Sequence, residues 1–325
     1  MQKARMKWRL GGILVGLVSV TLQPVLAQEF PNKTVRIVSA SAAGGSIDTA
    51  VRLIAAEMTK SLGQTVIVEN KTGGNQTIAY TYVAKQVPND GYVIAAVSVG
   101  SMTSLPLIMK DLQFDPLKDL PPILDIGEAR LLFASPKGQS WKTVKELVGY
   151  AQANPGKLNF GTSASSLYLY MLELLRALGV KANYIPYNSS GSAYMVALAN
   201  ADVHLGFVTV AQASSLRDKY QFMAVTGSQR RAPYMDVPTL AELGYTQIKG
   251  TAYSLNTPVG VPTVALDRLY SAASQALRQP GVIAGYEKLG VDIVNNTPDM
   301  AAKRLAAEAK LFSDIAKSTN AKLTD

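Results

Sequence analysis

The sequence contains no cysteine and a single histidine among its 325 residues. The absence of cysteine excludes disulfides, thiolate metal sites, a cysteine nucleophile and a lipid-modified cysteine. Catalytic motifs are lacking as well: there is no HExxH, no Walker loop, no GxGxxG and no Gly-x-Ser-x-Gly. The sequence therefore predicts neither an enzyme nor a metal site, and we expect no cofactor.

Dense blocks of charge are also missing. The formal net charge is +9, but four basic residues and no acidic ones precede residue 28, so the rest carries 28 basic against 23 acidic residues, or +5. These charges are scattered and no basic patch with interleaved aromatics is present, which excludes a nucleic-acid partner. A mildly positive surface attracts small anions by long-range steering.

Only one long apolar run is present, from Leu10 to Val20, and it is shorter than the ~20 residues that a membrane span needs. A basic segment precedes it, and Val25-Leu26-Ala27 follows it with small residues at the cleavage positions. This pattern predicts an export signal at residues 1–27, cleaved after Ala27. The remaining chain of roughly 300 residues is too long for one typical core and favours two domains.

Short β-branched runs alternate with longer helical patterns, which predicts an α/β fold with parallel sheets. The expected strands are Thr34–Ser39, Thr65–Glu69, Tyr92–Val97, Leu131–Ala134, Leu158–Gly161, Ala182–Pro186, Val203–Val208 and Phe222–Val225. The helical patterns between them are Ile47–Leu62, Thr77–Gln86, Thr143–Asn154, Ser166–Leu178, Ser192–Asn200 and Ala211–Asp218.

After Pro262 the pattern changes to helices without strands: Val264–Leu277, Val282–Leu289 and Pro298–Ser318. Such helices must pack on a sheet formed earlier in the chain. Two extended stretches, Ile123–Ser135 and Gly250–Pro258, could carry the chain between domains. We therefore expect a discontinuous first domain of residues 28–130 plus 254–325, a second domain of residues 131–253, and a ligand cleft between them.

The stretch from Ser39 to Asp48 joins a predicted strand to a predicted helix through small residues. Its backbone N–H groups, together with the helix dipole, could bind an anion. The alternative is an ordinary turn in which Ser46 or Asp48 caps the helix. The candidate binding residues here are Ala43, Gly44, Gly45, Ser46 and Asp48.

Three further loops of small residues follow predicted strands. In parallel α/β sheets such loops gather at the carboxyl ends of the strands, where ligands bind. They offer hydroxyl and N–H donors but no Lys or Arg, which suits a carboxylate. Their candidate binding residues, with two adjacent tyrosines, are Ser98, Gly100, Ser101, Thr162, Ser163, Ser165, Ser166, Tyr168, Tyr187, Ser189 and Ser190.

A different hypothesis makes the chain an exported hydrolase that uses a loop serine. It requires His204, the lone histidine, within hydrogen-bond reach of a serine hydroxyl. His204 lies in a strand-like run without a motif around it, so a structural histidine is favoured.

The order of short motifs along almost the whole mature chain resembles the Bug/TctC family, the extracytoplasmic receptors of tripartite tricarboxylate transporters. The matching segments include Gly44-Gly45-Ser46-x-Asp48, Leu62-Gly63-Gln64, Val68-Glu69-Asn70-Lys71, Phe114-Asp115-Pro116-Leu117-Lys118-Asp119, Pro155-Gly156-Lys157-Leu158-Asn159, Asp236-Val237-Pro238-Thr239 and Pro258-x-Gly260-x-Pro262.

This resemblance implies a two-domain periplasmic binding protein of type II, a Venus flytrap with parallel-rich sheets and a hinge of two crossing strands. It implies a carboxylate bound by loops of both domains, a membrane permease as partner, and a location in the periplasm of a Gram-negative bacterium. A sensor kinase is a further candidate partner, and we expect a monomer.

The sequence departs from the family pattern at three places. The family's loop rich in Gly, Asn and Ser appears here as Thr162-Ser163-Ala164-Ser165-Ser166. Ala42-Ala43 stand where the family commonly has prolines, so the first loop is expected to be looser. Val208 and Thr209 occupy the place where the family often has an acid that could pair with the ammonium group of an amino acid. We therefore expect a carboxylate without an amino group, and the nearby tyrosines favour an aromatic one.

Overall fold

The computed structural model describes residues 30–187, 191–214 and 216–321. The predicted signal at residues 1–27 and the candidate residues Ser189 and Ser190 lie outside this part of the chain. No helix in the described ranges is long and apolar enough to cross a bilayer.

A six-stranded mixed sheet with the order β11-β4-β10-β3-β1-β2 forms one half of the molecule. β1 pairs in parallel with β2 and β3, whereas β10 runs antiparallel to β3 and β4. Because β3 and β4 are both antiparallel to β10, the carboxyl ends of β1–β4 lie at the same edge of the sheet. The strands are β1 (Val35–Ser39), β2 (Val66–Asn70), β3 (Val93–Ser98), β4 (Pro122–Ala129), β10 (Thr251–Asn256) and β11 (Val291–Asp292).

Helices cover both faces of this sheet because side chains alternate between the faces along each strand. Ile37 packs into a core with α1, α8 and α9, whereas the neighbouring Val38 packs into a core with α2 and α3. These helices are α1 (Ser46–Leu62), α2 (Thr77–Lys85), α3 (Val99–Ile108), α8 (Thr263–Ala276) and α9 (Pro280–Leu289).

The other half contains two smaller sheets, with the orders β8-β5-β9 and β6-β7. A parallel bridge between Phe160 and Leu205 places β6 beside the start of β8. The strands are β5 (Leu131–Pro136), β6 (Leu158–Thr162), β7 (Ala182–Pro186), β8 (Gly206–Thr209) and β9 (Tyr220–Val225); the helices are α4 (Val144–Ala153), α5 (Ser165–Leu178), α6 (Gly191–Ala199) and α7 (Val210–Ser214).

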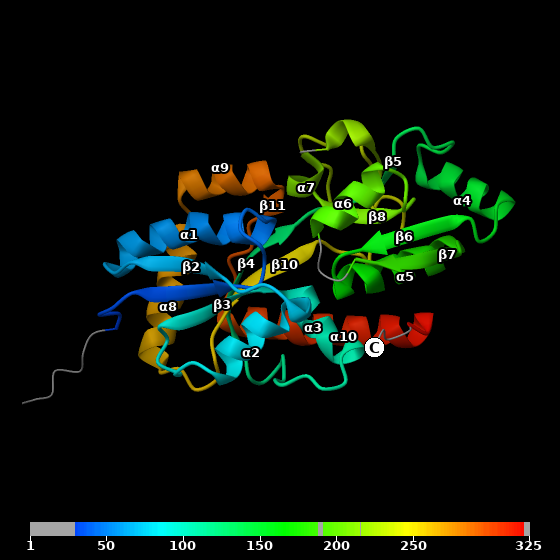
Figure 1. Cartoon of the computed structure of the whole chain (residues 1–325). Helices are drawn as coiled ribbons and strands as arrows, with labels where there is room; N and C mark the ends of the chain where they lie inside the picture. Colours follow the sequence, from blue (N-terminus) through cyan, green and yellow to red (C-terminus); the bar gives the residue numbers. More distant parts are fainter. Residues whose placement is uncertain (1–29, 188–190, 215, 322–325) are drawn as a thin grey trace, which may run out of the picture.

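The last helix, α10 (Pro298–Thr319), runs along both halves (Figure 1). Its Leu305 is buried in the core that contains α2 and α3, whereas Phe312 and Ile315 are buried in the core that contains α4 and α5. One helix therefore joins the two halves in addition to the strands that connect them.

The two crossing stretches are strands rather than plain connections. β4 and β5 are separated by Arg130 alone, and β10 returns the chain to the six-stranded sheet. The predicted domain limit at 130/131 falls between β4 and β5, whereas the limit at 253/254 falls inside β10. The limits themselves stay a prediction.

Two expectations about secondary structure were wrong. The C-terminal region contains a short strand, β11, which adds to the free edge of β4. The stretch from Val99 to Ser104, expected to be a loop, is the first part of helix α3. Residues Val99 to Leu105 are all buried, and Ser101, Thr103 and Ser104 are interspersed with apolar residues, so the segment shows no separate polar and apolar faces from which a helical period could be recognised.

Candidate functional site

The carboxyl ends of the strands in one half face the carboxyl ends of strands in the other half. β4 ends at the edge where β1, β2 and β3 end, and β5 begins after one further residue. β8 is antiparallel to β5, and Leu131 at the start of β5 pairs with Thr209 at the end of β8. Since β6 is parallel to β8 and β7 to β6, the carboxyl ends of β6, β7 and β8 face the carboxyl ends of β1–β4. This places the predicted loops of the two halves in opposition.

The first loop, between β1 and α1, exposes Ala43 and Gly44 to solvent. Gly44 has φ +79°, which favours glycine, and its N–H donates to Asp48 Oδ2 at 2.9 Å. The N–H of Gly45 donates to the Ala42 carbonyl at 3.1 Å. Two of the N–H groups that were expected to bind a ligand are therefore used inside the loop in this structure.

Asp48 is the residue that fixes this loop. It is 1% exposed and accepts hydrogen bonds from Arg52 Nε at 3.0 Å, Asn70 Nδ2 at 2.7 Å and the Gly44 N–H. Burial raises the pKa of the Asp48 carboxyl, but the hydrogen bonds from Arg52, Asn70 and Gly44 outweigh it and hold that pKa below its usual range. Asp48 is thus an ionised positioning residue.

Ser46 is the first residue of α1, and its hydroxyl points into the protein. In the described part of the chain Ser46 Oγ is buried without a hydrogen-bond partner, although the Tyr253 hydroxyl lies close to it. Burial raises the pKa of Tyr253 to about 12. Neither Ser46 nor Asp48 caps α1 as the alternative prediction required, because the N-cap is Gly45.

A loop that the sequence reasoning missed follows β2 at the same edge. Asn75 and Gln76 have φ of 51° and 75°, a left-handed conformation that is uncommon outside glycine and is often found at functional sites. The Tyr80 hydroxyl donates to Gln76 Oε1 at 2.6 Å and accepts from the Ser98 N–H at 3.3 Å. The run Gly73-Gly74-Asn75, shortly after the predicted strand Thr65–Glu69, was the signal for this loop.

The second predicted group lies at the start of α3 and is buried. Ser98 is 9% exposed and Ser101 4%, and Ser98 Oγ donates to Ser101 Oγ at 3.2 Å. A Cβ on Gly100 would lie 3.1 Å from Ser166 Cβ, so α3 packs closely against α5 there. The small residues at this position serve helix packing in this structure.

The third group joins the second across the two halves. Ser104 Oγ of α3 and Ser165 Oγ of α5 are 2.6 Å apart. Ser163 is partly exposed, whereas Thr162 and Ser166 are buried. The structure thus brings the ends of β3 and β6 together, as their positions after parallel strands predicted.

The tyrosines near these loops pack mainly against protein. Tyr168 is 9% exposed, and its ring centroid lies 4.4 Å from that of Tyr184. Tyr187 donates its N–H to the Thr162 carbonyl at 3.2 Å, and a Cβ on Gly161 would lie 3.0 Å from Tyr187 Cε2. Gly161 therefore makes room for the Tyr187 ring, and Tyr187, which follows β7, lies beside the end of β6.

Val208 and Thr209, predicted to affect specificity, lie at the end of β8. Val208 is fully buried, in a core with Leu132 and Ala134. The Thr209 N–H donates to Gln212 Oε1 at 2.9 Å, and the Gln212 N–H donates to Thr209 Oγ1 at 3.2 Å. This reciprocal pair caps α7, so no carboxylate and no unengaged hydroxyl is supplied at these two positions.

His204 lies at the opposite end of β6 from the loops. Its Nδ1 accepts the N–H of Asn159 at 3.0 Å, and burial lowers the pKa of its imidazole. Asn159 precedes Ser163 by four residues of extended chain, roughly 13 Å. This geometry does not support a His204–serine catalytic pair. In the described ranges no three His, Asp or Glu side chains are grouped so that they could hold a metal ion.

Two α/β halves that oppose the carboxyl ends of their strands define the class of periplasmic binding proteins. The structure of periplasmic binding protein BugD superposes with a TM-score of 0.79 at 27% identity, covering 90% of this chain and 99% of BugD. The chain belongs to the tripartite tricarboxylate transporter receptor family, TctC, whose model matches residues 50–320.

Several relatives match over most of their length. A Cupriavidus necator protein of the gbd 5′ region is 34% identical over 269 residues, covering 82% of this chain and 81% of the relative. BugT of Bordetella pertussis is 26% identical, covering 96% and 97%. MatC from Rhodopseudomonas palustris, solved with bound malate, has a TM-score of 0.77 at 29% identity and coverages of 88% and 99%. Another R. palustris protein, solved with adipate, has a TM-score of 0.81 at 27% identity and coverages of 90% and 98%.

Proposed function

We propose that this chain is a non-catalytic periplasmic receptor that binds a small carboxylate between its two halves and delivers it to a tripartite tricarboxylate transporter permease. The observation that carries the proposal is the opposition of two sets of βα loops, with helices α3 and α5 in contact through Ser104 Oγ and Ser165 Oγ, which are 2.6 Å apart. The malate and adipate in the related structures support a carboxylate as the ligand class.

Binding would use hydroxyl and N–H donors in place of a cation. Each hydrogen bond to a charged group contributes roughly 1.5–3 kcal/mol, so three or four at each end of a dicarboxylate reach micromolar affinity after ordering costs are subtracted. In the structure described here Gly44 and Gly45 use their N–H groups inside the first loop, so these two donors are not available to a ligand. Closure of the two halves would have to rearrange this loop to complete the set of donors.

Thermal unfolding with a panel of carboxylates tests the proposal directly. The panel contains malate, adipate, benzoate and citrate, with matched alcohols as controls. A ligand at 100 times its dissociation constant should stabilise the protein by about 2.7 kcal/mol. If no carboxylate shifts the unfolding transition, the proposal is wrong.

A pair of matched variants locates the site. Ser163→Trp places a large side chain at a partly exposed position between the halves, and we expect it to abolish the stabilisation by ligand. Ser271→Trp, at an exposed position on α8, should leave that stabilisation unchanged. Equal responses of the two variants would contradict the proposed location.

A further inference from the structure

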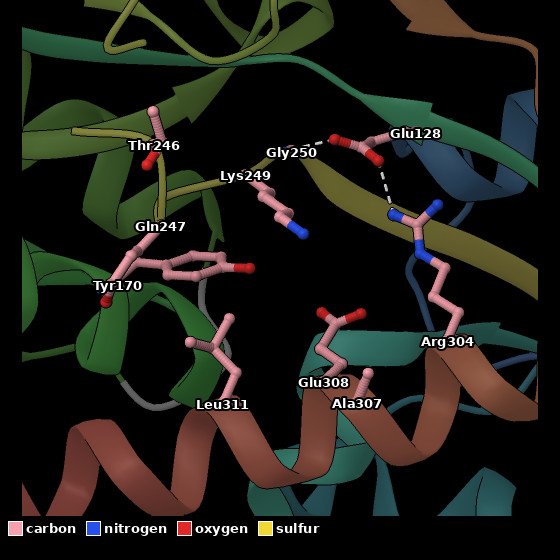
Figure 2. A pocket seen from close by; sticks show the side chains of 10 residues that line it. All are labelled: Glu128, Tyr170, Thr246, Gln247, Lys249, Gly250, Arg304, Ala307, Glu308 and Leu311. Atoms are coloured by element: carbon pink, nitrogen blue, oxygen red, sulfur yellow. Dashed lines mark hydrogen bonds and ion pairs between the residues drawn. The ribbon is translucent and has the colours of Figure 1, made fainter. Parts of the chain in front are cut away.

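A cavity of about 430 Å³ lies where α5, α10 and the segment that precedes β10 meet (Figure 2). Its lining includes Glu128, Tyr170, Lys249, Arg304, Glu308 and Leu311, and none of the predicted carboxylate-binding residues. The volume falls in the ~300–1,000 Å³ range of small-molecule sites.

Glu308 points its carboxylate into this cavity (Figure 2) and is only 9% exposed. Within the described ranges, no hydrogen bond and no ion pair within 4 Å reaches that carboxylate. On its other side it lies against α3, because a Cβ on Gly100 would lie 2.8 Å from Glu308 Oε1. A buried polar group without a partner is costly, which indicates a position that a ligand group or water satisfies.

The nearby Arg304 does not satisfy Glu308, because its guanidinium is engaged elsewhere. Arg304 Nη2 donates to Glu128 Oε2, and Arg304 Nε lies 3.9 Å from Asp125 Oδ2. Glu128 is engaged as well, since its Oε1 accepts the Gly250 N–H at 2.9 Å. These contacts leave the Glu308 carboxylate without a hydrogen bond or ion pair from Arg304 at the cavity wall.

Lys249 supplies the complementary charge on the opposite wall. Its ammonium group points into the cavity toward Glu308 (Figure 2), yet the two side chains form no ion pair within 4 Å in the described part of the chain. The Tyr170 hydroxyl also faces the cavity, and Leu311 and Ala307 add an apolar surface. An anion alone would leave the buried Glu308 unpaired, whereas a molecule that carries both an ammonium group and an anionic group pairs Glu308 and the exposed Lys249 at once.

We propose that this cavity is a second ligand site, separate from the carboxylate site, that binds a small zwitterion with its ammonium group on Glu308 and its anionic group on Lys249. Both contacts are charge-assisted hydrogen bonds, and a short aliphatic chain between the ligand's two charged groups would pack on Leu311. The residues that line this cavity differ from those proposed to bind the carboxylate at the opposed loops.

The place of the cavity links it to the strands that connect the two halves. Gly250 directly precedes β10, and a Cβ there would lie 2.5 Å from the Ala129 carbonyl at the end of β4. The cavity walls therefore come from both halves and from their connection. If the zwitterion binds one arrangement of the halves more tightly than the other, it would change the affinity of any ligand that requires the halves to rotate, and that ligand would change the affinity for the zwitterion by the same factor.

Isothermal titration calorimetry of the mature protein with β-alanine and γ-aminobutyrate tests the site. Propionate and propylamine serve as single-charge controls and should bind at least about tenfold more weakly. Glu308→Gln and Lys249→Met should each lower zwitterion affinity at least about tenfold. Lys310→Met and Asp314→Asn alter an exposed ion pair of the same helix and should change nothing.

The Ser163→Trp variant separates the two sites. Zwitterion binding that persists in Ser163→Trp and is lost in Lys249→Met supports the cavity as the zwitterion site. This conclusion holds whether or not a carboxylate binds at the opposed loops. Binding that is lost in Ser163→Trp and retained in both cavity variants would place the zwitterion between the loops and overturn the inference. So would the absence of any binding tighter than about 1 mM. Lys249 is exposed, so Lys249→Met decides the question even if Glu308→Gln fails to fold.

Discussion

The side-chain amide of Asn70 donates to Asp48 Oδ1 at 2.7 Å and to the Ser41 carbonyl at 2.9 Å. Asn70 is the last residue of β2, whereas Ser41 and Asp48 belong to the loop and helix that follow β1. One amide at the end of a neighbouring strand therefore fixes both ends of the first loop, and Asp48 in turn holds the N–H of Gly44.

Removing this amide should destabilise the protein. Asn70→Ala leaves the buried Asp48 carboxylate with one donor fewer, so the free energy of unfolding should fall by about 1–3 kcal/mol in urea denaturation. Asn183→Ala is the matched control, because that amide also donates to two acceptors but is exposed, and the loss there should stay within ~0.5 kcal/mol. Equal losses at the two positions would contradict the role given to Asn70.

Replacement of glycine by alanine should have opposite effects on stability at Gly44, which has a left-handed conformation, and at Gly149, which lies in a helix. Gly44→Ala introduces a Cβ at φ +79° and should cost about 1–2 kcal/mol, with a parallel loss of carboxylate affinity. Gly149→Ala lies within α4, where a Cβ meets no atom within 4 Å, and should stabilise by about 0.5–1 kcal/mol. Denaturant midpoints of the two variants measured side by side check this; a stable Gly44→Ala variant would show that the loop relaxes without cost.

Glu308 predicts a pH dependence of stability. Burial raises the pKa of Glu308 from 4.5 to about 7, a shift that Glu128 and Asp125 increase and that Arg304 and Lys249 oppose. Between pH 4.5 and about 7 the folded state therefore keeps a proton on Glu308 that the unfolded state has lost. The free energy of unfolding falls as the pH rises through this window. Relative to Glu308→Gln, the wild type should lose roughly 3 kcal/mol between pH 4.5 and 7.5.

The control for that measurement is an exposed glutamate on α9, Glu287, changed to Gln. Its unfolding free energy should follow the wild-type curve across the window. A Glu308→Gln curve parallel to the wild type would mean that the Glu308 carboxylate is hydrated or paired in solution.

Ligand selectivity follows from the end of β8. Val208 is buried and the Thr209 hydroxyl caps α7, so neither position offers an acid to an ammonium group. Titration calorimetry should therefore show glutarate binding at least about tenfold more tightly than glutamate, which has the same chain length. Tight glutamate binding in a Lys249→Met background would contradict this expectation, since that background removes the cavity as a second site. Benzoate in the same series tests the expected aromatic preference.

The loops could be predicted because parallel strands place their carboxyl ends together, whatever the side chains are. Gly44 and Asp48 were found from the small residues between a strand and an amphipathic helix. The role of Asn70 could not be found, because it depends on which strand lies beside β1 and not on local pattern.

Helix α3 was missed for a physical reason. Val99 to Leu105 are buried on every side, so Ser101, Thr103 and Ser104 need not lie on one polar face, and the segment lacks the two-faced pattern that reveals a helix. Glu308 did leave a signal. It occupies a position in the apolar stripe of Ala301, Leu305, Phe312 and Ile315, where an acid is out of place. What that acid faces could be learned only from the packing of α5 and the segment before β10.

Helix α10 restricts how the molecule can open and close. It is one continuous 22-residue helix that buries Leu305 in one core and Phe312 and Ile315 in another, with Glu308 between them. Its two ends cannot move apart without breaking the helix or emptying one of the cores. We therefore expect relative motion of the halves to be a rotation about an axis near α10, with the largest displacements at the loop tips farthest from that helix.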